Sequence, residues 1–186
     1  MATVARLRRD APLAIVGIAV TRYCAYYDSP LGQILLTASE SALTGLHFVG
    51  EKYYPNVLPA WRYDADFSVI KSTMTQLDEY FAGKRQAFEV ALAPEGTEFQ
   101  RLVWDRLTTI RFGETATYGE LARRIGDVNA VRAVGAANGR NPISIVIPCH
   151  RVIGADGSLT GYAGGLDRKL ALLRLESAGS EFRLTS

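Results

Sequence analysis

The chain has 186 residues, which is long enough for one or two compact domains with a sizeable buried core. Its composition, with 48% hydrophobic and 22% charged residues, is ordinary for a soluble globular protein and excludes a compositionally biased chain. The formal net charge of +2 allows a nucleic-acid partner without indicating one, so the distribution of the charges has to decide.

The chain contains two cysteines, Cys24 and Cys149, and two histidines, His47 and His150. They form neither a CxxC pair nor a His/Cys cluster at metal-ligand spacing, so we expect no disulfide framework and no metal site. A reducing, cytoplasmic setting fits this cysteine usage best. Cys24 and His47 lie in apolar, strand-like runs, and we interpret both as structural residues.

The N-terminal segment superficially resembles a secretion signal. Arg6, Arg8 and Arg9 precede an apolar run from Ala11 to Val20. This run is interrupted by a proline, is too short to span a bilayer, and is not followed by a clear small-x-small cleavage site. We therefore expect residues 1–21 to form a flexible extension of a protein that has no membrane partner.

Residues 22–93 are typical of a small antiparallel sheet with one helix. Tyr26 to Gly32 predicts a strand followed by a turn, and residues 34–37 and 43–49 predict two more short strands. Apolar residues then recur at three- and four-residue intervals as far as Gly83, which predicts an amphipathic helix. The residues on its apolar face are Phe67, Ile70, Met74, Leu77 and Phe81.

The segment after this helix indicates the end of the first domain. Phe88, Val90 and Leu92 alternate as in a further strand. The sequence Ala93-Pro94-Glu95-Gly96 that follows is rich in turn formers and predicts a boundary between residues 22–93 and a second domain, residues 94–186.

The second domain begins with short helices. Thr97 with Gln100 forms a capping-box pattern that predicts a helix ending before Gly113. Thr117 with Glu120 repeats the pattern, and Asn129 is placed to cap a third helix that runs to Gly139. Two short helices about a tight turn are typical of a helix-turn-helix, although any small helical hairpin has the same outline.

Charge and residue size both favour contact of the two helices between Thr117 and Gly139 with DNA. Five arginines against two acidic residues make this part of a nearly neutral chain basic. The arginines are Arg123, Arg124, Arg132, Arg140 and Arg151. The second of these helices, which runs to Gly139, also carries small residues that allow close approach of another surface, namely Ala133, Gly135, Ala136 and Ala137. Packing of one helix on another explains small residues equally well.

Cys149 is the candidate nucleophile of the chain. Residues 144–147 predict a buried strand, and Pro148 suits the first turn of a helix, so Cys149 should lie at a helical start. Backbone N–H groups there would stabilise a thiolate and lower the cysteine pKa. The alternative is that Cys149 is a small buried apolar residue.

His150 is the candidate base for this cysteine. Side chains of adjacent residues rarely meet, so a bridging water is the expected link between Cys149 and His150. The base also needs an orienting acid, and Asp156, Asp167 and Glu176 are available nearby in the sequence. Glu176 ends an apolar-periodic helix that must pack on the core, which would carry its carboxylate inward.

The assembled motif Asn141-Pro142-Ile143-Ser144-Ile145-Val146-Ile147-Pro148-Cys149-His150-Arg151-Val152 resembles that of the methylated-DNA–protein-cysteine methyltransferases, the O6-alkylguanine-DNA alkyltransferases, in their bacterial stand-alone form. Further matching segments occur in the same order, from about Tyr26 to Ala178. They are Asp28-Ser29-Pro30-Leu31-Gly32, Phe112-Gly113-Glu114, Thr117-Tyr118, Arg132-Ala133-Val134-Gly135 and Thr160-Gly161-Tyr162-Ala163-Gly164-Gly165.

The resemblance implies an α+β fold and a direct-reversal DNA repair activity. Residues 22–93 would form a ribonuclease-H-like domain with an antiparallel sheet and a helix. Residues 94–186 would form a mostly helical, winged-helix-like domain with the helix-turn-helix. The activity would be stoichiometric transfer of the alkyl group from O6-alkylguanine, and as an open alternative from O4-alkylthymine, to Cys149 in a monomer without a cofactor.

The resemblance also implies the roles of individual residues. His150 would act on Cys149 through a water, with Glu176 orienting its ring, Asn141 bracing the turn and Tyr118 donating to guanine N3. The carbonyls of Cys149 and Val152 and the N–H of Ala163, within the segment Tyr162-Ala163-Gly164, would contact the extruded base. Arg132 would enter the base stack, and the remaining DNA contacts would come from Ala133, Gly135, Ala136, Arg140 and Arg151.

Two other functions fit parts of the sequence. An alkyltransferase-like protein senses lesions without repairing them, but that subgroup replaces the acceptor cysteine, which is present here as Cys149. A thiol protease or acyltransferase would need oxyanion-stabilising groups and a substrate groove, and no motif in the sequence supplies them. Turnover of an activated ester would distinguish such an enzyme.

Overall fold

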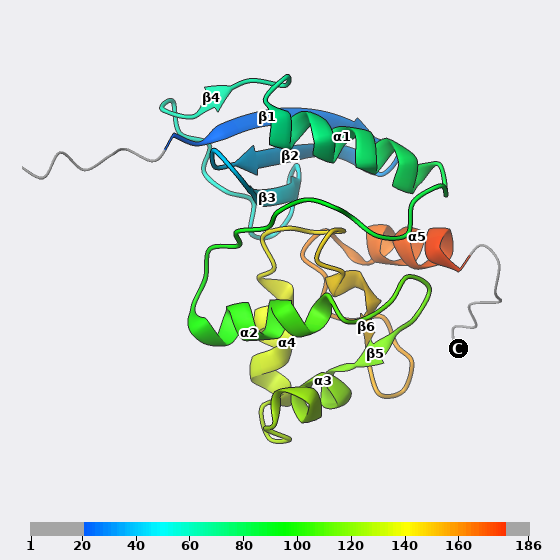
Figure 1. The fold of residues 1–186 in the computed structure, drawn as a ribbon. Coiled ribbons are helices and arrows are strands. Elements are labelled where there is room, and N and C mark those ends of the chain that lie inside the picture. Colours follow the sequence, from blue (N-terminus) through cyan, green and yellow to red (C-terminus); the bar gives the residue numbers. More distant parts are fainter. Residues whose placement is uncertain (1–20, 178–186) are drawn as a thin grey trace, which may run out of the picture.

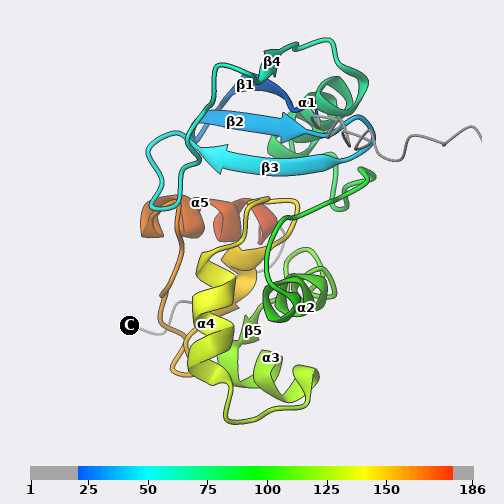
Figure 2. The same ribbon diagram turned by 90° about the vertical axis from the view of Figure 1, so that its left-hand side faces the viewer.

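The structure is a computed structural model that describes residues 21–177. The extension predicted for residues 1–21 therefore lies, apart from residue 21, outside the described residues. Figures 1 and 2 show an N-terminal sheet covered by one helix and a C-terminal group of short helices. The helix α5 (Leu166–Glu176) lies between these two parts in both views. The predicted α+β class is confirmed.

The N-terminal sheet contains four strands in the order β3-β2-β1-β4. β1 (Tyr23–Ser29), β2 (Gly32–Ala38) and β3 (Leu43–Phe48) form an antiparallel meander, and the two-residue β4 (Arg62–Tyr63) pairs parallel to β1. Gly32, at φ +110°, has the left-handed backbone conformation that the tight turn between β1 and β2 requires. The helix α1 (Ser68–Phe81) packs on the sheet with Ile70, Leu77 and Tyr80 buried.

The strand predicted around residues 88–92 is wrong. This segment is extended, but it contributes only an isolated bridge between Leu92 and Leu43. The backbone of Glu89 is bonded instead by the side chain of Gln76 on α1, whose Oε1 accepts from the Glu89 N–H at 2.7 Å. An amide side chain thus takes the place of a neighbouring strand.

The C-terminal part has the predicted helices. Both capping boxes are present, at Thr97 before α2 (Glu98–Leu107) and at Thr117 before α3 (Tyr118–Ile125). The next helix, α4 (Val131–Gly139), packs on both, and the Trp104 indole donates to the Ala137 carbonyl at 2.9 Å. A short parallel pair, β5 (Ala116–Thr117) with β6 (Val152–Ile153), connects α3 to the segment after Cys149.

The cap predicted for α4 is wrong. Ala130 occupies the N-cap position, and no side chain caps the helix. Asn129 lies one residue too early, and its backbone N–H donates to the Asp127 carboxylate at 2.9 Å. Asp127 therefore organises the turn between α3 and α4, which leaves the Asn129 side chain without a capping role.

One buried apolar cluster runs through both parts of the molecule. Where the parts meet, the Leu46 N–H on β3 donates to the Pro142 carbonyl at 2.8 Å, and the Ser144 N–H donates back to the Leu46 carbonyl at 3.0 Å. The segment that leads to Cys149 is therefore fixed to the N-terminal sheet. Among the helices of residues 21–177, none has both the length and the apolar character needed to cross a membrane.

Candidate functional site

Cys149 begins a single 3₁₀ turn, Cys149–Arg151, directly after Pro148. The expectation of a helical start at this position is confirmed. The buried strand predicted at residues 144–147 is wrong, because the segment forms turns and Ile145 has φ +71°, the one positive value of a non-glycine residue within 21–177. The segment winds around the Asn141 side chain, which accepts from the Ile143 N–H at 3.0 Å and donates to the Ile147 carbonyl at 2.8 Å.

Cys149 is 3% exposed, and two asparagine side chains bond it, one at the sulfur and one at the backbone carbonyl. Asn141 Nδ2 is 3.0 Å from Cys149 Sγ, and Asn138 on α4 donates to the Cys149 carbonyl at 3.4 Å. The same amide that shapes the turn therefore also contacts the sulfur. An amide N–H pointing at sulfur favours the thiolate over the thiol.

The pKa of Cys149 differs from the sequence-based expectation. Burial raises the pKa of the thiol to about 11, and this effect exceeds the lowering by the Asn141 hydrogen bond and by the charge of Lys169. The predicted lowering by a helical start is therefore wrong in this structure, because three residues of 3₁₀ helix provide a weak dipole for a sulfur with little solvent. The thiol needs a base to lose its proton at neutral pH.

His150 and Glu176 are brought together although they are far apart in the sequence. His150 Nε2 lies 2.9 Å from Glu176 Oε1, and both side chains are buried. Because burial lowers the pKa of His150, the ring is neutral near pH 7, and Nε2 must carry the hydrogen that the carboxylate accepts. Nδ1 then has the free lone pair, and this buried atom has no hydrogen-bond partner among residues 21–177.

The Glu176 carboxylate is the centre of a buried network. Arg151 donates to it through Nε at 2.7 Å and Nη2 at 2.9 Å, and the Tyr80 hydroxyl on α1 donates at 2.7 Å. Burial alone would raise the pKa of this carboxyl, but the hydrogen bonds from His150 and Arg151 hold the pKa at about 2. Glu176 therefore remains an anion that orients the His150 ring.

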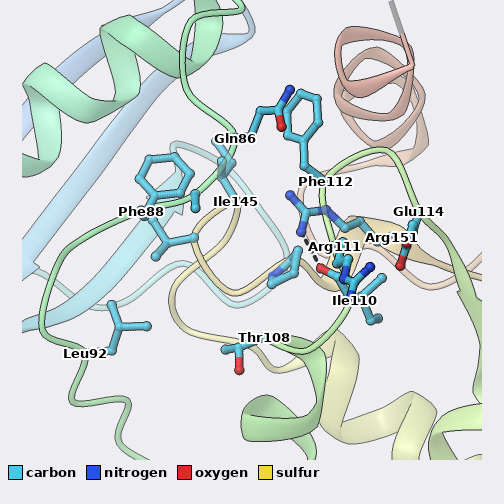
Figure 3. Close-up of a pocket in the computed structure, with 13 residues that line it drawn as sticks. Gln86, Phe88, Leu92, Thr108, Ile110, Arg111, Phe112, Glu114, Ile145 and Arg151 are labelled. Atoms are coloured by element: carbon cyan, nitrogen blue, oxygen red, sulfur yellow. Dashed lines mark hydrogen bonds between the residues drawn. The ribbon is translucent and has the colours of Figure 1, made fainter. Parts of the chain in front are cut away.

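Arg151 is not on the surface predicted to bind DNA. It is 7% exposed, and besides Glu176 it binds the Ile110 carbonyl through Nη1 at 2.6 Å. A cavity of about 560 Å³ lies beside this arginine, where residues 86–92 and 108–114 meet the active-site turn. Figure 3 shows Arg151 directed at Ile110 in this cavity, where it is the one candidate site residue in the lining.

A second cavity, of about 420 Å³, lies between α4 and the loop 161–166. Gly135 and Ala136 line one side and Tyr162 and Ala163 the other, so four candidate site residues meet there. Gly164 is a buried residue of this loop, and its carbonyl accepts from Arg168 at 2.9 Å. This size and concave shape suit a small planar ligand.

Tyr118 and Val152 lie near the same loop. The Tyr118 hydroxyl donates to the Thr160 carbonyl at 3.1 Å, and a Cβ atom added to Gly161 would stand 2.7 Å from that hydroxyl. Val152 is buried in β6, and its carbonyl accepts from Lys169 at 2.5 Å. Both residues thus border the loop that carries Tyr162 and Ala163.

The outer face of α4 carries most of the residues predicted to contact DNA. Arg132, Ala133, Ala136 and Arg140 are exposed, and Gly135 is half-buried. Val134 and Ala137 point into the core instead, so helix packing explains the small side chain of Ala137 but not those on the outer face. Arg123 and Arg124 on α3 are exposed as well.

Sequence reasoning missed Lys169, which is fully buried on α5. Its Nζ donates to two backbone carbonyls, of Val152 and of Thr160. The available signal was its spacing, since Lys169 occupies the same helical stripe as the apolar Leu173 and the site residue Glu176. Within the described part of the chain, no group of three His, Cys, Asp or Glu side chains is arranged to hold a metal ion.

Comparison with known proteins agrees with these features. Residues 22–94 match the family model described as 6-O-methylguanine DNA methyltransferase, ribonuclease-like domain, and residues 98–178 match the DNA binding domain of the same description. The chain is 51% identical over 156 residues to a methylated-DNA–protein-cysteine methyltransferase of Methanosarcina acetivorans, which covers 84% of this chain and 99% of that protein.

Mycobacterial relatives match as well in sequence and in structure. A protein of the same name from Mycobacterium tuberculosis is 48% identical over 158 residues, covering 85% of this chain and 94% of the relative. The crystal structure of Mycobacterium tuberculosis OGT in complex with DNA superposes with a TM-score of 0.78 at 46% identity, covering 86% of this chain and 94% of that one. The predicted resemblance is thus confirmed, and the chain belongs to the 6-O-methylguanine DNA methyltransferase family.

Proposed function

We propose that this protein repairs DNA by direct reversal, moving the alkyl group of O6-alkylguanine irreversibly to Cys149, once per molecule. The observation that carries the proposal is the buried Cys149 sulfur, bonded to Asn141 and adjacent in sequence to the His150–Glu176 pair. Family membership supports the reaction, since relatives at about half identity are methylated-DNA–protein-cysteine methyltransferases.

In the proposed reaction, His150 removes the thiol proton through a bridging water, using the lone pair on Nδ1. This nitrogen is buried and has no partner within residues 21–177, which supports the assignment. The Cys149 sulfur then forms a bond to the alkyl carbon while the bond from that carbon to guanine O6 breaks. The electron pair of the broken bond stays on guanine, and Tyr118 donates a proton to N3, so that the base is neutral. The proton taken up by His150 then restores the Tyr118 hydroxyl.

The substrate base would occupy the cavity of about 420 Å³ after leaving the double helix. The carbonyls of Cys149 and Val152 would accept from the guanine amino group, and the Ala163 N–H would donate to O6. The buried positions of Tyr162 and Gly164 support this assignment, because they hold the loop that forms one wall. Asn141 keeps the opposite turn in place by bonding the Ile147 carbonyl.

The DNA interface would be the outer face of α4, with α3 and α4 acting as the helix-turn-helix. Arg132, Ala133, Ala136 and Arg140 are exposed there, which supports contact with a duplex. We further propose a monomer with domains at residues 22–93 and 94–186. We place the protein in the cytoplasm, since Cys24 and Cys149 are both free thiols.

Intact-mass measurement after incubation with methylated duplex DNA tests the proposal. The expected result is a gain of one methyl group per protein molecule, located on the peptide that contains Cys149, with no further gain at excess DNA. A protein that binds the lesion without a change in mass would be a lesion sensor, and this result would reject the repair function. Processing of many lesions per molecule would reject it as well.

Arg132→Ala is expected to slow repair of duplex DNA by about tenfold to a hundredfold while leaving reaction with free O6-benzylguanine unchanged. Arg132 is exposed on α4 and is proposed to fill the space of the extruded base, a step that only duplex DNA requires. Single-turnover rates on both substrates provide the measurement. Arg174→Ala, exposed on α5, is the matched control, and equal losses on both substrates would contradict the stacking role.

A further inference from the structure

Lys169 is a buried cation that has no role in the reaction proposed above. It lies on α5 with 0% exposure, and its two hydrogen-bond partners, the carbonyls of Val152 and Thr160, are uncharged. No carboxylate of the described residues forms an ion pair with it; the Glu176 carboxylate on the same helix is bonded by His150, Arg151 and Tyr80. A buried ammonium group normally requires a counter-charge.

The two carbonyls belong to different segments near the candidate base site. Val152 directly follows the turn Cys149–Arg151, whereas Thr160 directly precedes the loop with Tyr162 and Ala163. The Thr160 carbonyl also accepts from the Tyr118 hydroxyl at 3.1 Å. A single Nζ atom therefore links the acceptor turn, the substrate loop and the tyrosine on α3.

Lys169 and Glu176 lie seven residues apart, which places them on one face of α5 at a separation of about 10 Å along the axis. This face contacts the turn Cys149–Arg151. Glu176 bonds the His150 and Arg151 side chains, and Lys169 bonds the carbonyl of Val152, the residue after the turn. Glu176 orients the base, which leaves Lys169 on the side of the substrate loop.

The charges of Lys169 and Cys149 influence each other. Burial lowers the pKa of Lys169 to about 8, and the negative charge of a Cys149 thiolate opposes this effect. In return, the charge of Lys169 lowers the pKa of Cys149 more than any other charge does. The other groups around the sulfur are His150 on the turn, Glu51 after β3, Tyr118 on α3 and Tyr162, and of these Glu51 raises the pKa of Cys149.

We propose that Lys169 is a positioning residue whose ammonium group is the counter-charge of the Cys149 thiolate and fixes the Val152 and Thr160 carbonyls around the guanine. The inference rests on the proposed function, because it assigns the purpose of the charge to the alkyl-acceptor reaction. Alkylation converts the thiolate into a neutral thioether, so each transfer removes the partner of Lys169.

Lys169→Met tests the charge with a side chain of similar length. Reaction of Cys149 with iodoacetamide is followed by peptide mass mapping at pH 7.5, where Lys169, with a pKa of about 8, still carries its charge. The variant is expected to react about tenfold more slowly than the wild type. Lys169→Arg retains the charge and should keep the wild-type rate, as should Arg174→Met on the exposed side of α5. A folded Lys169→Met protein with the wild-type rate overturns the proposal.

A measurement on the wild-type protein covers the case in which Lys169→Met does not fold. The chain has four lysines, and Lys52, Lys71 and Lys84 are exposed, so ¹⁵N-lysine labelling isolates the Lys169 signal with three internal controls. In the unmethylated protein, the Lys169 signal is expected to respond to the ionisation of Cys149 as well as to its own titration. Methylation of Cys149 should remove this response, while the signals of the other lysines stay unchanged. An unchanged Lys169 titration overturns the proposal.

These readouts are independent of the repair function. If the wild-type protein takes no methyl group from DNA, the repair function fails, whereas the rate of the iodoacetamide reaction still reports the charge of Lys169. If the protein is methylated by DNA and the iodoacetamide rate of Lys169→Met is unchanged, the inference about Lys169 fails alone.

Discussion

Cys149→Ala is expected to abolish transfer of label from methylated DNA to the protein and to leave duplex binding intact. The alanine methyl group cannot accept an alkyl group, while the proposed DNA contacts lie on the outer face of α4. Removing one buried sulfur destabilises the fold by about 1 kcal/mol, which is too little to unfold a typical domain. Radiolabel transfer and fluorescence anisotropy with the same methylated duplex measure the two properties separately.

Cys24→Ala is the matched control for this experiment. Cys24 is also a free, buried thiol, at 5% exposure, and lies in β1 of the N-terminal sheet. Among residues 21–177, no histidine or amide side chain is hydrogen-bonded to its sulfur. The control is expected to accept one label per molecule, like the wild type. Label retained by Cys149→Ala, or lost by Cys24→Ala, would contradict the assignment of the acceptor.

The elements that the sequence predicted correctly are those governed by nearby residues. The capping boxes at Thr97 and Thr117 connect residues three positions apart, so the local sequence contains all of the interaction. The strand predicted at residues 88–92 failed because the Gln76 side chain on another element bonds the backbone at Glu89, and pairing with β3 is confined to the bridge between Leu43 and Leu92. Alternating apolar residues predict an extended chain, but they do not show whether a neighbouring strand is present.

For the functional site, too, some residues could be predicted from the sequence and others could not. The motif around Cys149 indicated the nucleophile, and the apolar period of the last helix predicted that Glu176 turns inward, where it meets His150 at 2.9 Å. The buried position of Arg151 could not be predicted from the sequence. Its neighbours in the sequence suggested one more arginine of a basic surface, and its partner Glu176 lies far along the chain. Lys169 was missed since a single lysine in an apolar stripe is usually read as a solvated boundary residue.

The raised pKa of Cys149 could not be predicted either, because it also depends on residues that are distant in the sequence. Sequence shows that Pro148 starts a turn, and a turn start favours a thiolate, but burial depends on how the whole fold covers the sulfur. At 3% exposure the loss of solvent dominates. Activation then depends on groups brought from several elements, namely Asn141 before the turn, His150 within it and Lys169 on α5.

Glu176→Gln is expected to destabilise the protein by about 3–5 kcal/mol at pH 7, since it leaves the buried Arg151 guanidinium without its counter-charge. The His150 ring loses its anionic partner at the same time, so the rate of alkyl transfer should also fall, by about tenfold or more. Urea unfolding and single-turnover transfer measure the two effects. Glu114→Gln, at an exposed position, serves as the control and should change neither.

The pH dependence distinguishes loss of charge from loss of packing. The folded-state pKa of Glu176 is about 2, below the value of about 4.3 expected for an unfolded glutamate, so its contribution is complete above about pH 4.5. As the pH falls from there toward 2, the carboxylate of the wild type becomes protonated and this contribution, about 3 kcal/mol, disappears. The stability difference between wild type and Glu176→Gln should therefore narrow between pH 4.5 and the acid limit of folding. A difference that stays constant over this range would show that shape, rather than charge, makes Glu176 necessary.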